Sequence, residues 1–245
     1  MITFVCWKWV PKQPHGPRLF RSEHVNVLRA MLERHAPFPH KLVCITDDTR
    51  GLDPRIEAFP MPETTFEELV NPHQVKYDAA QAWGRKKYFP NCYRRLWVFS
   101  REATVLGERV FALDIDVIVT GDLTPLVERD EDFVGWVDDK EPKLKGGAYL
   151  LRTGSHPEVW DEFDPETSPA LAATSSGTGS DQAWMTYKLF PPEGSWGVQD
   201  GLVKVNWLRA GPQPSTRLVF TAGHSPPWSA DVQRRYPWVA QYWRM

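Results

Sequence analysis

Two aspartates interrupt an apolar stretch near the middle of the chain. Residues 111–119 read Phe-Ala-Leu-Asp-Ile-Asp-Val-Ile-Val, so Asp114 and Asp116 have apolar neighbours on both sides. Side chains along a strand alternate between its two faces, so we expect both carboxylates to point to one side and Ile115 to the other. Neighbouring carboxylates repel each other unless a cation, a basic side chain or a shared proton compensates them. A divalent cation would do so through oxygen ligands, and would also bridge to the phosphates of a substrate.

A solvated turn is the alternative interpretation of this pair, because Asp-x-Asp tripeptides are frequent by chance. The surrounding apolar run favours the metal site, since it places the pair at the end of a buried strand. Ligands of open α/β sheets bind beyond the carboxyl ends of the strands, which is where we expect Asp114 and Asp116.

The elements that must position this pair begin with an α/β pattern. The apolar run at 2–7 predicts a strand, and the run at 41–46 predicts a second one. Between them, residues 23–35 carry an apolar stripe at helical spacing, and Ser22 is the expected capping residue. Strand, helix and strand in this order indicate a parallel crossover unit.

The rest of the chain extends this pattern to a mixed, mostly parallel sheet flanked by helices. We expect helices at 92–104, 156–163 and 180–189, the last capped by Ser180, and short strands at 56–59, 109–113, 132–137, 148–151, 202–205 and 218–221. No repeat and no linker interrupts the pattern, so we expect one domain over 1–245.

Composition argues against several classes of protein. Lys and Arg number 29 against 31 Asp and Glu, and the net charge of -2 gives no general attraction to nucleic acid or to anionic membranes. The cysteines are Cys6, Cys44 and Cys92, without a CxxC pair, which argues against a disulfide framework and a zinc site. We see no basic leader and no run of about 20 apolar residues such as a spanning helix needs, so we expect a cytoplasmic protein.

Together these features resemble the GT-A glycosyltransferases, most closely those of glycosyltransferase family 8. Short blocks in a fixed order over most of the chain carry the resemblance, at 2–7, 43–48, 93–96, 106–119, 146–151, 179–182 and 223–228. The resemblance implies a single GT-A, Rossmann-like α/β domain, with a nucleotide-binding half over 1–120 and an acceptor-side half over 121–245.

The resemblance also implies roles for residues near the reacting groups. Asp114 and Asp116 match the family's DxD motif, in which the first Asp contacts the ribose or the metal and the second binds Mn²⁺ or Mg²⁺, which holds the nucleotide diphosphate. Asp181 and Gln182 match the Asp-Gln pair that faces the donor sugar. Arg95 matches a basic helix residue near the donor sugar and phosphates, where a guanidinium can grip phosphate in two places.

Four residues match the nucleotide side of the family's site. Cys6 and Trp7 end the first strand, which lines the nucleotide, and Asp47 or Asp48 matches the acidic residue that accepts from the uracil or the ribose.

The C-terminal block departs from the family pattern. Family members place a metal-binding His before Gly223 and a diphosphate-binding Lys where this chain has Pro226. His224, directly after the glycine, is the candidate for the third metal ligand. A basic residue such as Lys145 is the candidate for the missing cation.

Tryptophan is abundant, with 12 in 245 residues, and we expect some of these amphipathic rings to face a ligand. Trp7, Trp196 and Trp228 lie at strand ends or in loops and are the expected platforms for a nucleotide or a sugar. The rings expected to pack in the interior are Trp136, Trp160, Trp184 and Trp207.

The sequence therefore predicts a metal-dependent glycosyltransferase that moves a hexose from a nucleotide-sugar, expected to be a UDP-sugar, to a carbohydrate or other acceptor. The resemblance implies retention of configuration; an inverting enzyme would need Asp138 or Asp139 as the base. Two alternatives stay open. A sugar nucleotidyltransferase fits less well, because the residues after the first strand lack a Gly-rich basic loop. A non-catalytic sugar- or nucleotide-binding protein on the same scaffold is the other.

Overall fold

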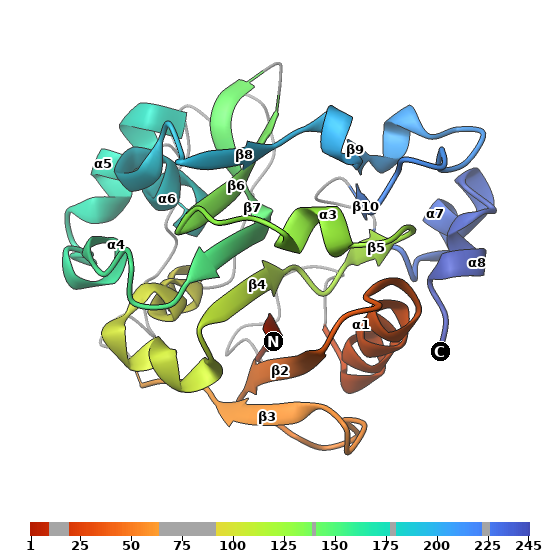
Figure 1. Cartoon of the computed structure of the whole chain (residues 1–245), viewed down its shortest axis with the longest axis horizontal. Helices are drawn as coiled ribbons and strands as arrows, with labels where there is room; N and C mark the ends of the chain where they lie inside the picture. The colour runs from red at the N-terminus through yellow and green to blue at the C-terminus, as the bar shows by residue number, and fades with distance from the viewer. Residues whose placement is uncertain (10–19, 64–91, 139–140, 177–179, 222–225) are drawn as a thin grey trace.

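A seven-stranded sheet is the frame of the molecule (Figure 1). The computed structural model describes residues 1–9, 20–63, 92–138, 141–176, 180–221 and 226–245. The strand order is β3-β2-β1-β4-β7-β6-β8. These strands are β1 (Ile2–Lys8), β2 (His40–Thr46), β3 (Glu57–Pro60), β4 (Arg109–Leu113), β6 (Phe133–Asp138), β7 (Glu141–Arg152) and β8 (Gly194–Trp196).

Most neighbouring strands of this sheet are parallel. β3, β2, β1 and β4 run in one direction, β7 is antiparallel to β4 and to β6, and β8 is parallel to β6. The expected mixed, mostly parallel α/β sheet is therefore confirmed. Parallel strands of this kind bring several carboxyl ends to one edge, and this is where ligands of open α/β sheets bind.

A second, three-stranded sheet lies beside the first, in the order β5-β10-β9. It consists of β5 (Val117–Val119), β10 (Leu218–Phe220) and β9 (Leu202–Lys204), with β10 antiparallel to β5 and parallel to β9. Because β4 ends at Leu113 and β5 begins at Val117, residues 114–116 connect the two sheets.

Helices and short helical turns cover the sheets. The α-helices are α1 (Ser22–His35), α3 (Thr124–Val127), α4 (Glu158–Asp161), α5 (Ser168–Ser176), α6 (Asp181–Leu189), α7 (Ala230–Arg235) and α8 (Val239–Tyr242). The 3₁₀ helices are η2 (Cys92–Phe99), η3 (Arg101–Leu106), η4 (Val198–Asp200) and η5 (Val205–Trp207). Among the helices of the described ranges, none combines the length and the apolar character needed to cross a membrane.

Alternate residues of β1 enter two different cores, as strand geometry requires. Phe4 and Cys6 pack on one face with residues of α1 such as Leu28. Val5 and Trp7 pack on the other face with the η2–η3 and α4–α6 side of the molecule. In the described part of the chain, the central sheet is thus buried on both faces, so its strand ends are positions that can meet a ligand.

Three local predictions are wrong in detail. Ser22 does not cap α1, because the helix already includes it and its hydroxyl donates to the carbonyl of Arg50 over 2.5 Å. The helix expected at 92–104 is two 3₁₀ helices, since Ser100 between them has extended backbone angles. The helix expected at 156–163 is shorter and occupies Glu158–Asp161.

Glycines at two turns give a test of how tightly β9 is placed. Gly201, just before β9, has a φ of 85°, and a Cβ there would lie 2.2 Å from the carbonyl oxygen of Ser215. Gly51 has a φ of 76°, but its added Cβ would meet nothing closer than 3.5 Å. We expect Gly51→Ala to lower the free energy of unfolding by about 1 kcal/mol, from backbone strain alone. Gly201→Ala should lower it by about 3 kcal/mol or more, because the backbone must also move.

Urea denaturation of both variants measures this difference. Equal losses in the two variants would show that the contact between Gly201 and the Ser215 carbonyl does not constrain the chain.

Candidate functional site

The Arg95 guanidinium contacts several residues at the carboxyl edge of the sheet. Arg95 Nη1 lies 2.9 Å from Asp114 Oδ1, and Arg95 Nε lies 3.3 Å from Asp181 Oδ2. Its Nη2 donates to the carbonyl of Gly146 over 2.6 Å. The guanidinium carbon lies 5.0 Å from the centroid of the Trp7 ring, within the range of a cation–π contact. All three nitrogen atoms of Arg95 are therefore engaged by the protein.

Each of these side chains is placed by the end or start of a regular element. Trp7 is the next-to-last residue of β1, and Asp114 follows β4 directly. Asp181 is the first residue of α6, whose N-cap Ser180 accepts from the Ala183 N–H over 3.1 Å, as predicted. Arg95 projects from η2. The sequence separations are large, so only the tertiary fold brings these groups together.

A shift of register between β6 and β7 determines where the Gly146 carbonyl lies. Opposite β6, the pairing jumps from Tyr149 to Lys145, which leaves residues 146–148 out of that ladder. The Gly147 carbonyl instead accepts from the Asp114 N–H over 3.0 Å. A Cβ on Gly147 would lie 3.2 Å from Asp114 Oδ2, so glycine allows the close approach of the carboxylate. Irregularities of this kind commonly occur next to functional sites.

Gln182 completes the inner side of this segment. Its Oε1 accepts from the Gly146 N–H over 2.9 Å, while its own carbonyl accepts from the Thr186 hydroxyl over 2.8 Å. Gly146, whose carbonyl accepts from Arg95, therefore also contacts Gln182 of the Asp-Gln pair that is expected to face the donor sugar. This arrangement fixes Gln182 and the irregular part of β7 relative to each other.

Burial and charge shift the titration of the cluster. Burial of the Arg95 guanidinium lowers its pKa, but Asp114 and then Asp181 outweigh this effect, so its pKa is raised. Burial raises the pKa of Asp181, and the charge of Arg95 only partly opposes that. Burial, together with the charge of Asp181, also raises the pKa of the Cys92 thiol. Arg95 thus stays charged, and burial makes Asp181 costly to ionise.

The structure gives Arg95 different partners from those expected of a phosphate-binding residue. Its side chain is only 14% exposed, and its contacts are with protein groups. The geometry suits a residue that orients Asp114 and Asp181. Contact of Arg95 with a diphosphate remains a prediction.

The sequence suggested that Asp114 and Asp116 point to the same side of one continuous strand. In the structure, both residues lie in the connection between β4 and β5. The chain turns between β4 and β5, and the Val117 N–H donates to the Asp114 carbonyl over 3.3 Å. Asp114 is 35% exposed at its side chain, whereas Asp116 is 7% exposed and its Oδ2 lies 3.5 Å from the Thr221 hydroxyl. The two carboxylates are therefore presented by a tight connection between sheets, not by a continuous strand.

Three carboxylates lie at this edge. Asp114, Asp116 and Asp181 can each ionise, and Arg95 contacts Asp114 and Asp181. Carboxylate oxygens are the ligands that Mg²⁺ and Mn²⁺ prefer, so the donor set fits the predicted ion. Within the described residues, no group of three or more His, Cys, Asp or Glu is arranged to hold a metal. The expected third ligand, His224, lies outside that part of the chain.

The buried indole nitrogen of Trp7, a donor beside Arg95, lacks a hydrogen-bond partner in the described part of the chain. Arg95 Nε and Asp181 Oδ2 also lack hydrogen-bond geometry, but they form the 3.3 Å ion pair with each other. Buried polar groups are normally satisfied, so the Trp7 nitrogen suggests a ligand or a water that meets it. The Trp7 ring is buried and Arg95 lies over it, so it is not the open platform that the sequence suggested. Contact of its indole nitrogen with a nucleotide stays a prediction.

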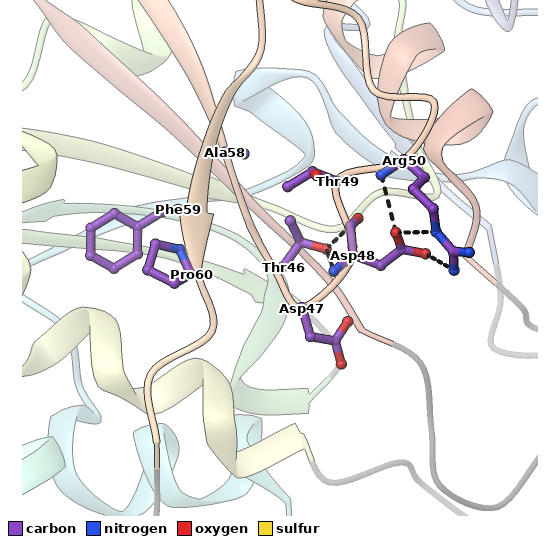
Figure 2. A pocket seen from close by; sticks show the side chains of 8 residues that line it. All are labelled: Thr46, Asp47, Asp48, Thr49, Arg50, Ala58, Phe59 and Pro60. Atoms are coloured by element: carbon purple, nitrogen blue, oxygen red, sulfur yellow. Dashed lines mark hydrogen bonds and ion pairs between the residues drawn. The ribbon is translucent and has the colours of Figure 1, made fainter.

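Figure 2 shows a second part of the edge, a cavity of about 360 Å³ between the ends of β2 and β3. Asp47 is exposed and lines it, whereas the Asp48 carboxylate is held by Arg50 through bonds of 2.9 Å from Nε and from Nη2. Hydrogen bonds from Arg50 lower the pKa of Asp48. Asp48 therefore already accepts from Arg50, whereas Asp47 presents its side chain to the cavity, and contact of either residue with a nucleotide stays a prediction.

Cys6 cannot contact a nucleotide. It is fully buried, and its thiol pKa is raised well above the usual value, first by its contact with Cys44 and then by burial. The residue that sequence analysis missed at this strand end is Lys8, which is buried and donates to the backbone carbonyl of Asp48 over 2.5 Å. Its position directly after the expected strand at 2–7 was the available signal.

The tryptophan assignments change as well. Trp196 is buried against Phe111, with ring centroids 5.1 Å apart, so it cannot serve as a platform. Trp228 is half-buried and stacks on His24 with centroids 3.7 Å apart. Burial lowers the pKa of His24 to about 4, so the imidazole under Trp228 is neutral at neutral pH. One face of Trp228 is thereby covered, and a ligand role for its other face stays a prediction.

The ionic cluster predicts an unequal response to arginine replacement. We expect Arg95→Met to lower the free energy of unfolding by about 3 kcal/mol, because it leaves Asp114 and Asp181 without their cation. The matched control is Arg101→Met in η3, whose ion pair with Asp161 is exposed and 3.9 Å long. That change should stay within about 0.5 kcal/mol. Equal effects in chemical denaturation would contradict the structural role of Arg95.

The raised pKa of Asp181 predicts that the stability of the protein depends on pH. Because its pKa is raised in the folded protein, stability falls as pH rises from the ordinary value of 3.8 through the folded value. Asp181→Asn removes this dependence, so the variant should gain stability relative to wild type at neutral pH and lose that gain in acid. Thermal unfolding across this pH range measures it. A difference between the two proteins that does not change with pH would refute the assignment.

Comparison with known proteins finds similarity in structure but not in sequence families. No protein-family model and no curated protein matches the sequence. The galactosyltransferase LgtC, in a complex with donor and acceptor sugar analogs, is similar with a TM-score of 0.58 at 15% identity, over 99% of this chain and 97% of that chain. An active-site mutant of LgtC gives a TM-score of 0.57 at 14% identity, over 98% of this chain and 95% of that chain.

The third match is the apo-form glycosyltransferase GlyE of Streptococcus pneumoniae TIGR4. Its TM-score is 0.57 at 14% identity, and the alignment covers 98% of this chain but 60% of that chain. At such identity the likeness concerns the fold. The chain has the fold of the GT-A glycosyltransferases, and nearly its whole length takes part in it.

Proposed function

We propose that the protein is a glycosyltransferase that moves a hexose from a nucleotide-sugar, a UDP-sugar in our assignment, to a carbohydrate or other acceptor. The observation that carries the proposal is the cluster of Asp114, Asp181 and Arg95 at the carboxyl edge of the sheet. A compensated acidic cluster there, in a fold that glycosyltransferases use, is suited to a metal-bound diphosphate and a sugar that develops positive charge. Residues 1–120 would carry the donor and residues 121–245 the acceptor.

Asp114 and Asp116 are the residues that would hold a divalent ion. When bound, Mn²⁺ or Mg²⁺ would supply Lewis-acid stabilisation to the leaving diphosphate. The contribution of the chain itself is to fix the carboxylates beforehand: Arg95 orients Asp114, and the Thr221 hydroxyl contacts Asp116. Preorganised charges of this kind supply much of the rate enhancement in many enzymes.

Asp181 would act on the donor sugar. Its carboxylate is buried and forms an ion pair with Arg95 over 3.3 Å. An ionised Asp181 would stabilise positive charge that develops at the anomeric carbon, and Gln182 would orient the sugar beside it. We assign retention of configuration, which needs no dedicated base from the protein. The candidate bases for inversion lie at the margin of the described chain, with Asp139 outside it.

Nucleoside diphosphate release tests the proposal directly. We expect at least one nucleotide-sugar to be turned over in the presence of Mn²⁺, and Asp116→Asn to reduce the rate by about 100-fold or more. The matched control is Asp231→Asn, whose carboxylate is exposed on α7, and which should keep the wild-type rate.

Three outcomes separate the candidate functions. Release that needs Mn²⁺ and Asp116 supports the transferase. Binding of a nucleotide-sugar without any turnover would support the non-catalytic alternative. Formation of a nucleotide-sugar from a nucleoside triphosphate and a sugar phosphate would instead identify a nucleotidyltransferase.

A further inference from the structure

A stacked pair of aromatic rings joins the two sheets. Trp136 lies in β6 of the large sheet, and Phe220 ends β10 of the small sheet. Their ring centroids are 3.9 Å apart, with an angle of 22° between the ring planes, and both residues are buried. Of the tryptophans expected in the interior, Trp136 is therefore confirmed, whereas Trp207 is 43% exposed. Because the two rings belong to different sheets, their contact limits how the sheets can move relative to each other.

Strand register places Phe220 beside the acidic connection between the sheets. Phe220 pairs with Val117 of β5, and Val117 directly follows Asp116. Thr221, whose hydroxyl lies 3.5 Å from Asp116 Oδ2, directly follows Phe220. The end of β10 that carries the Phe220 ring thus also supplies a contact to Asp116.

The Phe220 ring meets Asp114 at a glycine of β7. A Cβ on Gly147 would lie 2.9 Å from Cε1 of Phe220 and 3.2 Å from Asp114 Oδ2. The Gly147 carbonyl also accepts from the Asp114 N–H over 3.0 Å. The ring and the carboxylate therefore approach the same glycine, and the stack on Trp136 restricts the ring from moving away.

We propose that Phe220 is a positioning residue whose ring fixes the spacing at which Asp114 and Asp116 can share a divalent cation. The ring has no ligand atom, so it acts through its neighbours. It packs at Gly147 beside Asp114, and the adjacent Thr221 contacts Asp116. Close-packed interiors transmit strain, so a change at this ring reaches both carboxylates. The inference rests on the metal-binding role in the proposed function, but metal binding can be measured without a donor or an acceptor.

Titration with Mn²⁺ alone, followed by the electron paramagnetic resonance signal of the free ion, tests this role. We expect Phe220→Ala to weaken Mn²⁺ binding about 10-fold or more, as is usual when a residue that orients metal ligands is lost. Should Phe220→Ala fail to fold, Phe220→Leu keeps a smaller apolar side chain and should show the same direction of change. All titrations are made well below the melting temperature of each variant.

The matched control is Leu218→Ala. Leu218 is fully buried, lies two residues earlier on the same face of β10, and pairs with Val119 instead of Val117. This change should lower the melting temperature, as Phe220→Ala does, but keep the wild-type affinity for Mn²⁺. A purely structural role of Phe220 would give the two variants the same Mn²⁺ affinity.

Gly147→Ala perturbs the same contact from the opposite partner. The added methyl group would press on the Phe220 ring and on Asp114 Oδ2. Since the ring is backed by Trp136, we expect the carboxylate to yield and Mn²⁺ binding to weaken about 10-fold.

Wild-type Mn²⁺ affinity in the Phe220 variant or in Gly147→Ala, or equal losses in Phe220→Ala and Leu218→Ala, would overturn the proposal while leaving the proposed function in place. Absence of Mn²⁺ binding by wild type would overturn it together with the metal assignment. Mn²⁺ binding that depends on Phe220, without turnover of any nucleotide-sugar, would support the positioning role and remove the transferase.

Discussion

The ion pairs of Arg95 with Asp114 and Asp181 are the interaction on which the rest of the site depends. They join the connection between the two sheets to the first residue of α6, and a further contact reaches Gly146 in β7. Two carboxylates in this environment would repel each other and pay a desolvation penalty without the guanidinium. Asp116 is a third carboxylate at the same edge, and carboxylate oxygens are the ligands that a divalent cation prefers.

The surrounding fold keeps these groups at one edge by departures from regular structure. Residues 146–148 leave the ladder with β6, and the glycine at 147 allows Asp114 to approach the backbone. Residues 114–116 pass from the large sheet to the small one, so the same connection contacts Arg95 on one side and the Thr221 hydroxyl on the other. The two sheets therefore meet at the site, and each contributes a separate part of it.

Much of this could be predicted from local sequence, and the limits have physical causes. The β1–α1–β2 unit and the Ser180 cap follow from apolar spacing and from one side chain, and both are present in the structure. The break at Ser100 depends on backbone angles that no nearby glycine or proline signals. The burial of Trp196 is set by packing against residues such as Phe111, which is distant in the chain. The partners of Arg95 are equally distant in the chain, so the sequence offered only the family match and the residue type, which suggested contact with a phosphate.

Calorimetric titration with uridine diphosphate, in the presence and absence of Mn²⁺, tests the central claim most directly. The account predicts that wild type binds the diphosphate only with Mn²⁺, and that Asp116→Asn loses this binding while its melting temperature stays close to that of wild type. Equal affinity with and without Mn²⁺, or binding unaffected by Asp116→Asn, would contradict the assignment of Asp114 and Asp116 as the residues that hold a metal-bound diphosphate.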